Sequence, residues 1–100
     1  MYDMKHLAKF SRLAELAPEA FEKFVAFDAA AINAGTIPVK YKELMAVAVA
    51  LTTQCPYCIE IHATRAKNAG ATEQELAETT LVAAALRAGA AVTHGTHTLT

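Results

Sequence analysis

The chain has 100 residues, a formal net charge of −1 and no tryptophan, and 54% of its residues are hydrophobic. This length allows one domain at most, which we assign to residues 1–100. Lysine and arginine are scattered along the chain, so no electrostatic footprint for nucleic acid or an anionic membrane is visible. The apolar residues, mostly alanine, valine and leucine, exceed what a small monomer can bury. We therefore predict a homo-oligomer.

The sequence shows no sign of secretion or of a membrane span. The first ten residues, MYDMKHLAKF, lack the apolar region of a signal peptide. The longest apolar run, Leu44 to Leu51, is too short to cross a bilayer. We expect a cytoplasmic location, where structural disulfides are rare and a close cysteine pair is more often catalytic or metal-binding.

The first third of the chain predicts two helices. Asp3 can cap the first helix, and Ala17 ends it because the residue before a proline avoids the helical region. Pro18 suits the first turn of the second helix, and Gly35 is the expected stop. We expect the phenylalanines to pack in the core rather than to bind a cofactor. The apolar positions are Leu7, Phe10, Leu13 and Leu16, then Phe21, Phe24, Val25, Phe27 and Ile32.

Two more helices are predicted around the middle of the chain. After a linker at 36–38, a third helix runs from about Val39 to Thr53. Cys55 stands at the N-cap position of a fourth helix, because Pro56 suits its first helical position. Gly70 is the expected end of this helix.

A fifth helix follows a capping box in which Thr72 caps and Glu75 reaches back from the third helical position. Gly89 is expected to break or bend this helix. No segment shows the alternation typical of strands, so we predict an all-α fold with about five to six helices. The helix carries Leu76, Thr80, Val82, Ala83 and Leu86.

Both cysteines of the chain lie in the stretch CPYC. A helix N-terminus lowers the pKa of a thiol. Cys55 and Cys58 are three residues apart at a predicted helix start, so their sulfurs can approach bonding distance. His62 lies one turn further along the same face and can shuttle a proton to or from Cys58. Glu43 belongs to the preceding helix, so a neighbouring element or subunit must bring it back to the cysteines.

Other uses of these residues stay open at this point. The thiols can be inert core residues. Cys55, Cys58 and His62 can also bind zinc, with Glu43 as a fourth ligand, although we expect neither a metal nor a cofactor. CPYC is also the active-site tetrapeptide of glutaredoxins, but that fold needs strands and a cis-proline after the motif. Here the downstream pattern is helical.

The remaining histidines give weaker signals. His94 and His97 are one helical turn apart near the end of the chain. We interpret them as a solvated end or a tail that caps an interface, rather than as a second metal site. His6 is expected to be a surface residue.

The spacing Glu43-x11-Cys55-x2-Cys58-x3-His62, together with the helical sequence from Ile37 to the C-terminus, resembles the AhpD-like branch of the carboxymuconolactone decarboxylase family. The resemblance implies an all-α subunit that assembles as a trimer or hexamer. It implies that Cys58 is the attacking thiol, Cys55 the resolving thiol, and Glu43 and His62 a proton relay. Tyr57 stands where AhpD itself has another histidine, so peroxidase activity is expected to be weaker or differently tuned.

The resemblance also implies partners, which are a hydroperoxide or disulfide substrate and a thiol reductant protein of the lipoyl-bearing or thioredoxin-like kind. We therefore predict a thiol-dependent oxidoreductase. One alternative is lactone or decarboxylation chemistry, with His62 and Glu43 as acid and base, although the decarboxylase branch typically lacks the CxxC pair. Another alternative is a redox-sensing oligomer without enzyme activity.

Overall fold

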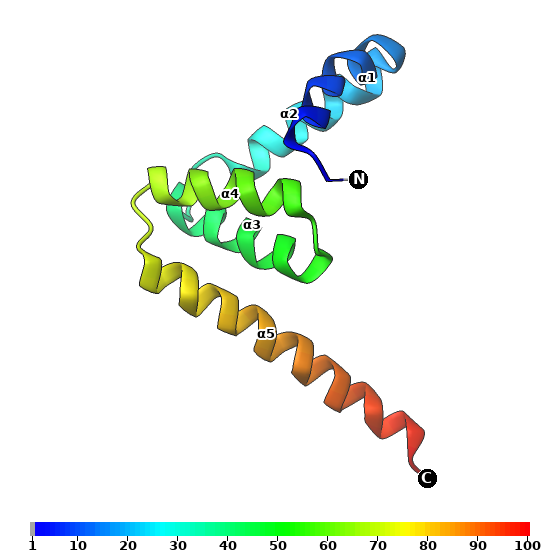
Figure 1. Ribbon diagram of the computed structural model, residues 1–100, viewed down its shortest axis with the longest axis vertical. Coiled ribbons are helices and arrows are strands. Elements are labelled where there is room, and N and C mark those ends of the chain that lie inside the picture. The colour runs from blue at the N-terminus through cyan, green and yellow to red at the C-terminus, as the bar shows by residue number, and fades with distance from the viewer. Residues whose placement is uncertain (1) are drawn as a thin grey trace.

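The computed structural model describes residues 2–100, and within them the chain forms helices and no strands. This confirms the predicted all-α fold class. A 3₁₀ helix opens the chain and another closes it, with five α-helices between them (Figure 1). In chain order the elements are η1 (Met4–Lys9), α1 (Phe10–Leu16), α2 (Pro18–Ile32), α3 (Val39–Thr53), α4 (Pro56–Asn68), α5 (Glu73–Gly95) and η2 (Thr96–Thr98).

The centre of the molecule is an antiparallel hairpin of α3 and α4 (Figure 1). Gln54 makes the tight reversal possible because it adopts the left-handed conformation, with φ of 58°, at the end of α3. Small side chains let the two helices approach closely, and Val47, Ala50 and Ala66 are buried. Both helices lie where the third and fourth were predicted, and α3 has the predicted bounds.

Helix α5 packs against α3 through its N-terminal half and then extends away from the rest of the molecule (Figure 1). Lys40 Nζ lies 3.0 Å from Glu75 Oε2, and Arg87 donates a hydrogen bond to the carbonyl of Thr52. The predicted capping box at Thr72 is present. The expected break at Gly89 is wrong, because α5 continues to Gly95; one glycine costs a helix only about 1 kcal/mol relative to alanine.

Helices α1 and α2 form a second hairpin that projects from the central one (Figure 1). The rings of Phe10 and Phe21 lie 5.7 Å apart. However, Phe24 is 57% exposed and Phe27 is 72% exposed, so the expectation that this stripe forms a core is wrong for the single subunit. The reason is that the hairpin meets α3 only near the end of α2.

Three predicted boundaries also differ from the structure. Asp3 caps as expected, accepting from the backbone N–H of Lys5, but the first helix is divided into η1 and α1. Helix α2 ends at Ile32 rather than at Gly35. At this end Lys42 Nζ donates to the carbonyls of Ala31 and Asn33, which takes the place of a glycine cap. Helix α4 ends at Asn68, and the left-handed residue after it is Gly70, with φ of 99°.

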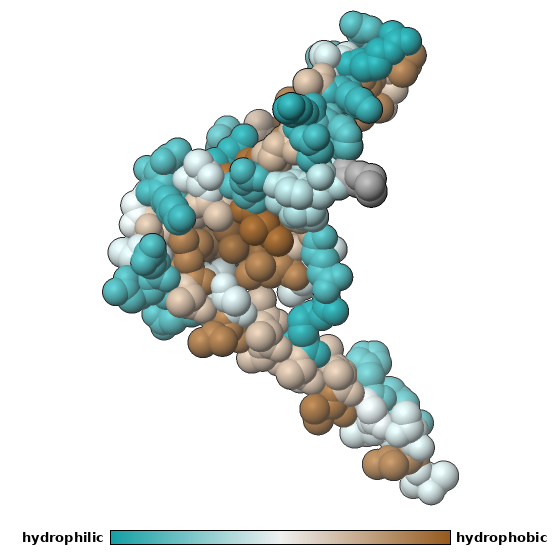
Figure 2. Space-filling model, viewed as in Figure 1, coloured by the Kyte–Doolittle hydropathy of each residue, from teal (hydrophilic) through white to brown (hydrophobic). Residues whose placement is uncertain are grey.

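The subunit is more extended than a typical domain of its length. Its radius of gyration is 16.6 Å, against about 13 Å for a compact chain of 100 residues. Hydrophobic residues gather on the surface over α3 and α4, and others stand out along α5 (Figure 2). The large apolar side chains that are more than half exposed outside the phenylalanine stripe include Leu16, Val49, Leu81, Val82, Leu86 and Val92.

The segment Glu73–Thr98 meets the length and composition expected of a membrane-crossing helix, and 6% of its most apolar stretch is buried in the subunit. Three glutamates lie in its first two turns. Helices that pack against protein partners meet the same criteria. The cytoplasmic location therefore stays a prediction.

Candidate functional site

The two cysteines lie where α4 begins, as the sequence predicts. Cys55 is the N-cap residue with an extended backbone, and Pro56 occupies the first helical position. The Sγ atom of Cys55 accepts a hydrogen bond from the backbone N–H of Cys58 at 3.3 Å. Sulfur thus fills the place that a serine or aspartate oxygen usually takes at a helix start.

The two sulfur atoms lie 2.7 Å apart, and both residues are half-buried. Donation from the Cys58 thiol, with support from backbone N–H groups, lowers the pKa of Cys55. Donating that hydrogen bond, together with burial, raises the pKa of Cys58 to about 11. Of the two thiols, Cys55 is therefore the one that loses its proton more readily, and Cys58 is the one that holds its proton more tightly.

Glu43 reaches the site from within the same chain. The α3–α4 hairpin places its Oε2 atom 2.6 Å from Nδ1 of His62. Glu43 is only 2% exposed, and it is the largest fully buried side chain among the described residues. A buried carboxylate needs a partner, and His62 provides it. The helix that brings Glu43 back is α4 itself, so no second subunit is required.

The Glu43–His62 contact fixes how the imidazole can work. When the carboxylate accepts from Nδ1–H, the neutral ring carries its lone pair on Nε2. The carboxylate also stabilises the imidazolium that forms when Nε2 takes a proton, as in other carboxylate–histidine pairs. His62 lies one turn after Cys58 on the same face of α4. The Glu43–His62 pair thus lies one helical turn from Cys58.

Within residues 2–100, no group of three or more His, Cys, Asp or Glu side chains is arranged to hold a metal ion. The rings of His94 and His97 lie 5.8 Å apart at the end of α5. His62 directs one nitrogen to Glu43 instead of to the sulfurs. The site is therefore described best as two adjacent pairs, one of thiols and one of acid and base.

The N-terminal segment is the part of the site that sequence reasoning missed. The hydroxyl of Tyr57, the residue before Cys58, lies 3.1 Å from Nδ1 of His6 and accepts from the backbone N–H of Asp3 at 3.2 Å. The ring of Tyr2 packs edge-on against the ring of Tyr57. His6 is on the surface as expected, but it contacts the motif. No local pattern indicates this, because the partners are more than 50 residues apart.

Comparisons with other proteins agree with the all-helical fold. The chain is 42% identical over 78 residues to an uncharacterized protein in the cox locus of Paracoccus denitrificans, covering 78% of this chain and 70% of that protein. It is 41% identical over 62 residues to an uncharacterized protein of Haemophilus influenzae, covering 61% of this chain and 55% of that protein. It thus spans little more than half of the second relative.

Two solved structures share the fold. A protein from Methanobacterium thermoautotrophicum superposes with a TM-score of 0.82 at 36% identity, covering 88% of this chain and 99% of that one. A carboxymuconolactone decarboxylase family protein from Legionella pneumophila gives a TM-score of 0.77 at 32% identity, covering 82% and 73%. The family model for carboxymuconolactone decarboxylases matches residues 18–100. The chain therefore belongs to the carboxymuconolactone decarboxylase family.

Proposed function

We propose that this protein is a thiol-dependent oxidoreductase of the AhpD-like branch, acting on hydroperoxides or disulfides as a single cytoplasmic domain. The observation that carries the proposal is the 2.7 Å contact between the Cys55 and Cys58 sulfurs at a helix N-terminus, one turn from a buried Glu43–His62 pair. A disulfide needs a sulfur separation of about 2.05 Å, so a small movement suffices to form one.

The first step oxidises Cys58. His62, supported by Glu43, removes the proton that Cys58 shares with Cys55, and the Cys58 thiolate attacks the terminal oxygen of the hydroperoxide. The O–O bond breaks, the sulfur becomes a sulfenic acid, and the alkoxide leaves with the proton that His62 returns. This transfer reconciles the attacking role of Cys58 with its raised pKa and with the lowered pKa of Cys55.

The second step uses Cys55, whose pKa is lowered by the contact with Cys58. Its thiolate attacks the sulfenic sulfur of Cys58, the S–O bond breaks, and the leaving hydroxide takes a proton from solvent to become water. One hydroperoxide is thus reduced to an alcohol and water while two thiols become one disulfide. A dithiol protein, lipoyl-bearing or thioredoxin-like, then restores the thiols by exchange.

An acid–base reaction on a lactone is the alternative for the same family. Glu43 and His62 alone would serve it, and thiols would be neither consumed nor required. The close sulfur contact favours the thiol reaction. Single-turnover stoichiometry separates the two, because a peroxide should consume two thiols per chain and a lactone none.

Role assignment within the pair can be tested by trapping. We expect the Cys55→Ser variant to leave a sulfenic acid on Cys58 that dimedone labels, because the resolving thiol is gone. Serine remains a good N-cap residue, so α4 should stay capped. The measurement is the mass of the dimedone adduct after one equivalent of peroxide.

The matched control is Cys58→Ser, in which only Cys55 can react. Faster dimedone labelling of this variant than of Cys55→Ser would reverse the proposed roles. A wild-type protein that forms no intramolecular disulfide with excess peroxide would remove the proposal itself.

Assembly as a trimer or hexamer is part of the proposal. The exposed apolar side chains of α5 and the exposed phenylalanines of α2 support it, because a monomer rarely leaves so much apolar surface in water. We expect light scattering at micromolar concentration to give three or six times the subunit mass of 10.6 kDa. Replacing Leu86, which is 67% exposed, with glutamate should reduce the mass, whereas Glu22→Gln on exposed polar surface should not. A monomeric wild-type protein would contradict the claim.

A further inference from the structure

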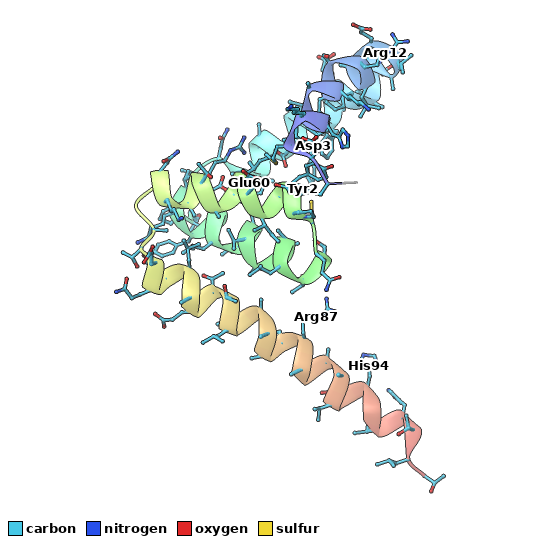
Figure 3. All side chains as sticks on the ribbon, in the orientation of Figure 1. Tyr2, Asp3, Arg12, Glu60, Arg87 and His94 are labelled. Atoms are coloured by element: carbon cyan, nitrogen blue, oxygen red, sulfur yellow. The ribbon has the colours of Figure 1, made fainter. Side chains whose placement is uncertain are left out.

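The N-terminal segment Tyr2–His6 is held on two residues of α4. The hydroxyl of Tyr2 donates to Oε2 of Glu60, and this bond raises the pKa of Tyr2 to about 12. The ring centroids of Tyr2 and Tyr57 are 4.9 Å apart, at an interplanar angle of 67°. Figure 3 shows Tyr2 and Asp3 beside Glu60, over the start of α4.

The second set of contacts converges on one hydroxyl. Tyr57 accepts from the backbone N–H of Asp3 and pairs with Nδ1 of His6. Tyr57 and Glu60 are three residues apart on α4, so they share one face of the helix. The segment Tyr2–His6 therefore docks on the first two turns of α4 rather than on the body of the subunit.

The first of these turns is also the one that thiol chemistry changes. In the reduced protein Cys55 Sγ caps the turn by accepting from the N–H of Cys58. A thiolate is a good acceptor, whereas a sulfur bonded to another sulfur carries no charge and accepts weakly. Disulfide formation therefore weakens the cap of the turn that carries Tyr57.

We propose that the segment Tyr2–His6 is a redox-linked strap, which docks preferentially on the reduced form of the Cys55–Cys58 pair through the positioning residues Tyr57 and His6. The inference rests on the proposed thiol function. Linkage makes the preference reciprocal: a strap that binds the dithiol better than the disulfide also stabilises the dithiol. Docking thus makes the disulfide easier to reduce, and oxidation loosens the strap.

This coupling gives the strap a role in the reaction cycle. In the reduced protein the strap covers the Tyr57 side of the motif. At this stage of the cycle only a small oxidant needs to reach the thiols. Once the disulfide has formed, the loosened strap uncovers the same turn for a reducing protein, which must bring its own dithiol to the disulfide.

Limited proteolysis tests the docking without any enzyme assay. Lys5 lies inside the strap, and trypsin can cleave after it only when the surrounding segment leaves α4. We expect cleavage after Lys5 to be about fivefold faster in the oxidised protein than in the reduced protein. Cleavage after Lys23, in α2 and away from the motif, is the internal control and should not change. The protein should carry no N-terminal tag.

The reduction potential tests the reciprocal effect. We expect Tyr57→Phe and His6→Ala each to shift the equilibrium with the dithiothreitol couple about fivefold toward the protein disulfide, which corresponds to a potential more negative by about 20 mV. Tyr41→Phe and His97→Ala remove the same groups far from the motif and should stay within twofold of wild type. A residue with a merely structural role would not move the potential.

Failure of the proposed thiol function and failure of the strap give different results. Formation of the disulfide is followed separately, as the loss of two hydrogens by mass. If no disulfide forms, both the proposed function and the strap are overturned. If it forms, but cleavage after Lys5 is the same in both redox states and the potential of Tyr57→Phe is that of wild type, the strap alone is overturned.

Discussion

Peroxide turnover is expected to fall at least about tenfold, and by as much as about 10²–10⁴-fold, when either Glu43 or His62 is replaced by glutamine. Glutamine keeps a similar shape and can hydrogen-bond, but it does not titrate. The Cys58 proton then has no acceptor that can return it to the leaving oxygen. Steady-state turnover of a small alkyl hydroperoxide, with a dithiol as reductant, measures the effect.

The double variant Glu43→Gln/His62→Gln tells a relay from two separate contributions. Residues that act as one unit give non-additive losses, so the double variant should be hardly slower than the slower single variant. Because Glu43 lies 2.6 Å from Nδ1 of His62, we expect it to act on the thiols through the imidazole. If the fold-loss of turnover in the double variant equals the product of the two single losses, the two residues act separately.

Two controls belong to this experiment. Glu22→Gln and His97→Gln remove the same groups from exposed positions outside the site, and both should turn over like wild type. A strong thiol oxidant that needs no proton relay should still form the disulfide in every variant. Wild-type turnover in Glu43→Gln would show that the buried carboxylate only supports the fold.

The part of the site that could be predicted from the sequence is the part that one helix determines. Cys55, Cys58 and His62 are brought together by helical periodicity alone, and Pro56 sets the helix start. Glu43 could be placed only by its spacing within a family signature. Its approach depends on the reversal at Gln54, a residue with no strong turn signal that nevertheless adopts a left-handed backbone.

The fold was predictable to the same degree and for the same reason. The local sequence pattern indicates where a helix forms, and the bounds of α3 and the capping box of α5 were predicted correctly. The phenylalanine stripe was misinterpreted because periodicity shows that a face is apolar but not what covers it. The contacts of Tyr57 with the N-terminal segment were missed because they join parts of the chain more than 50 residues apart.

Removal of the His62 side chain should also destabilise the folded protein. His62→Ala leaves Glu43, which is 2% exposed, as a buried carboxylate without its partner. Leaving a buried polar group without its hydrogen-bond partner typically costs about 1–3 kcal/mol, and more for a charged group, which is a large fraction of the roughly 5–15 kcal/mol that stabilises a domain. Urea unfolding followed by circular dichroism, at one fixed protein concentration, gives the free energy of unfolding.

A second variant distinguishes the cost of the unpaired Glu43 carboxylate from the cost of losing the imidazole ring. In the double variant His62→Ala/Glu43→Gln no charge is buried, so it should recover much of the stability that His62→Ala loses. His97→Ala, which removes a histidine from the exposed end of the chain, should unfold like wild type. If the double variant is as unstable as His62→Ala, the loss comes from packing around the imidazole. If His62→Ala itself unfolds like wild type, the Glu43–His62 contact contributes nothing to the fold, and its only remaining role would be in the reaction.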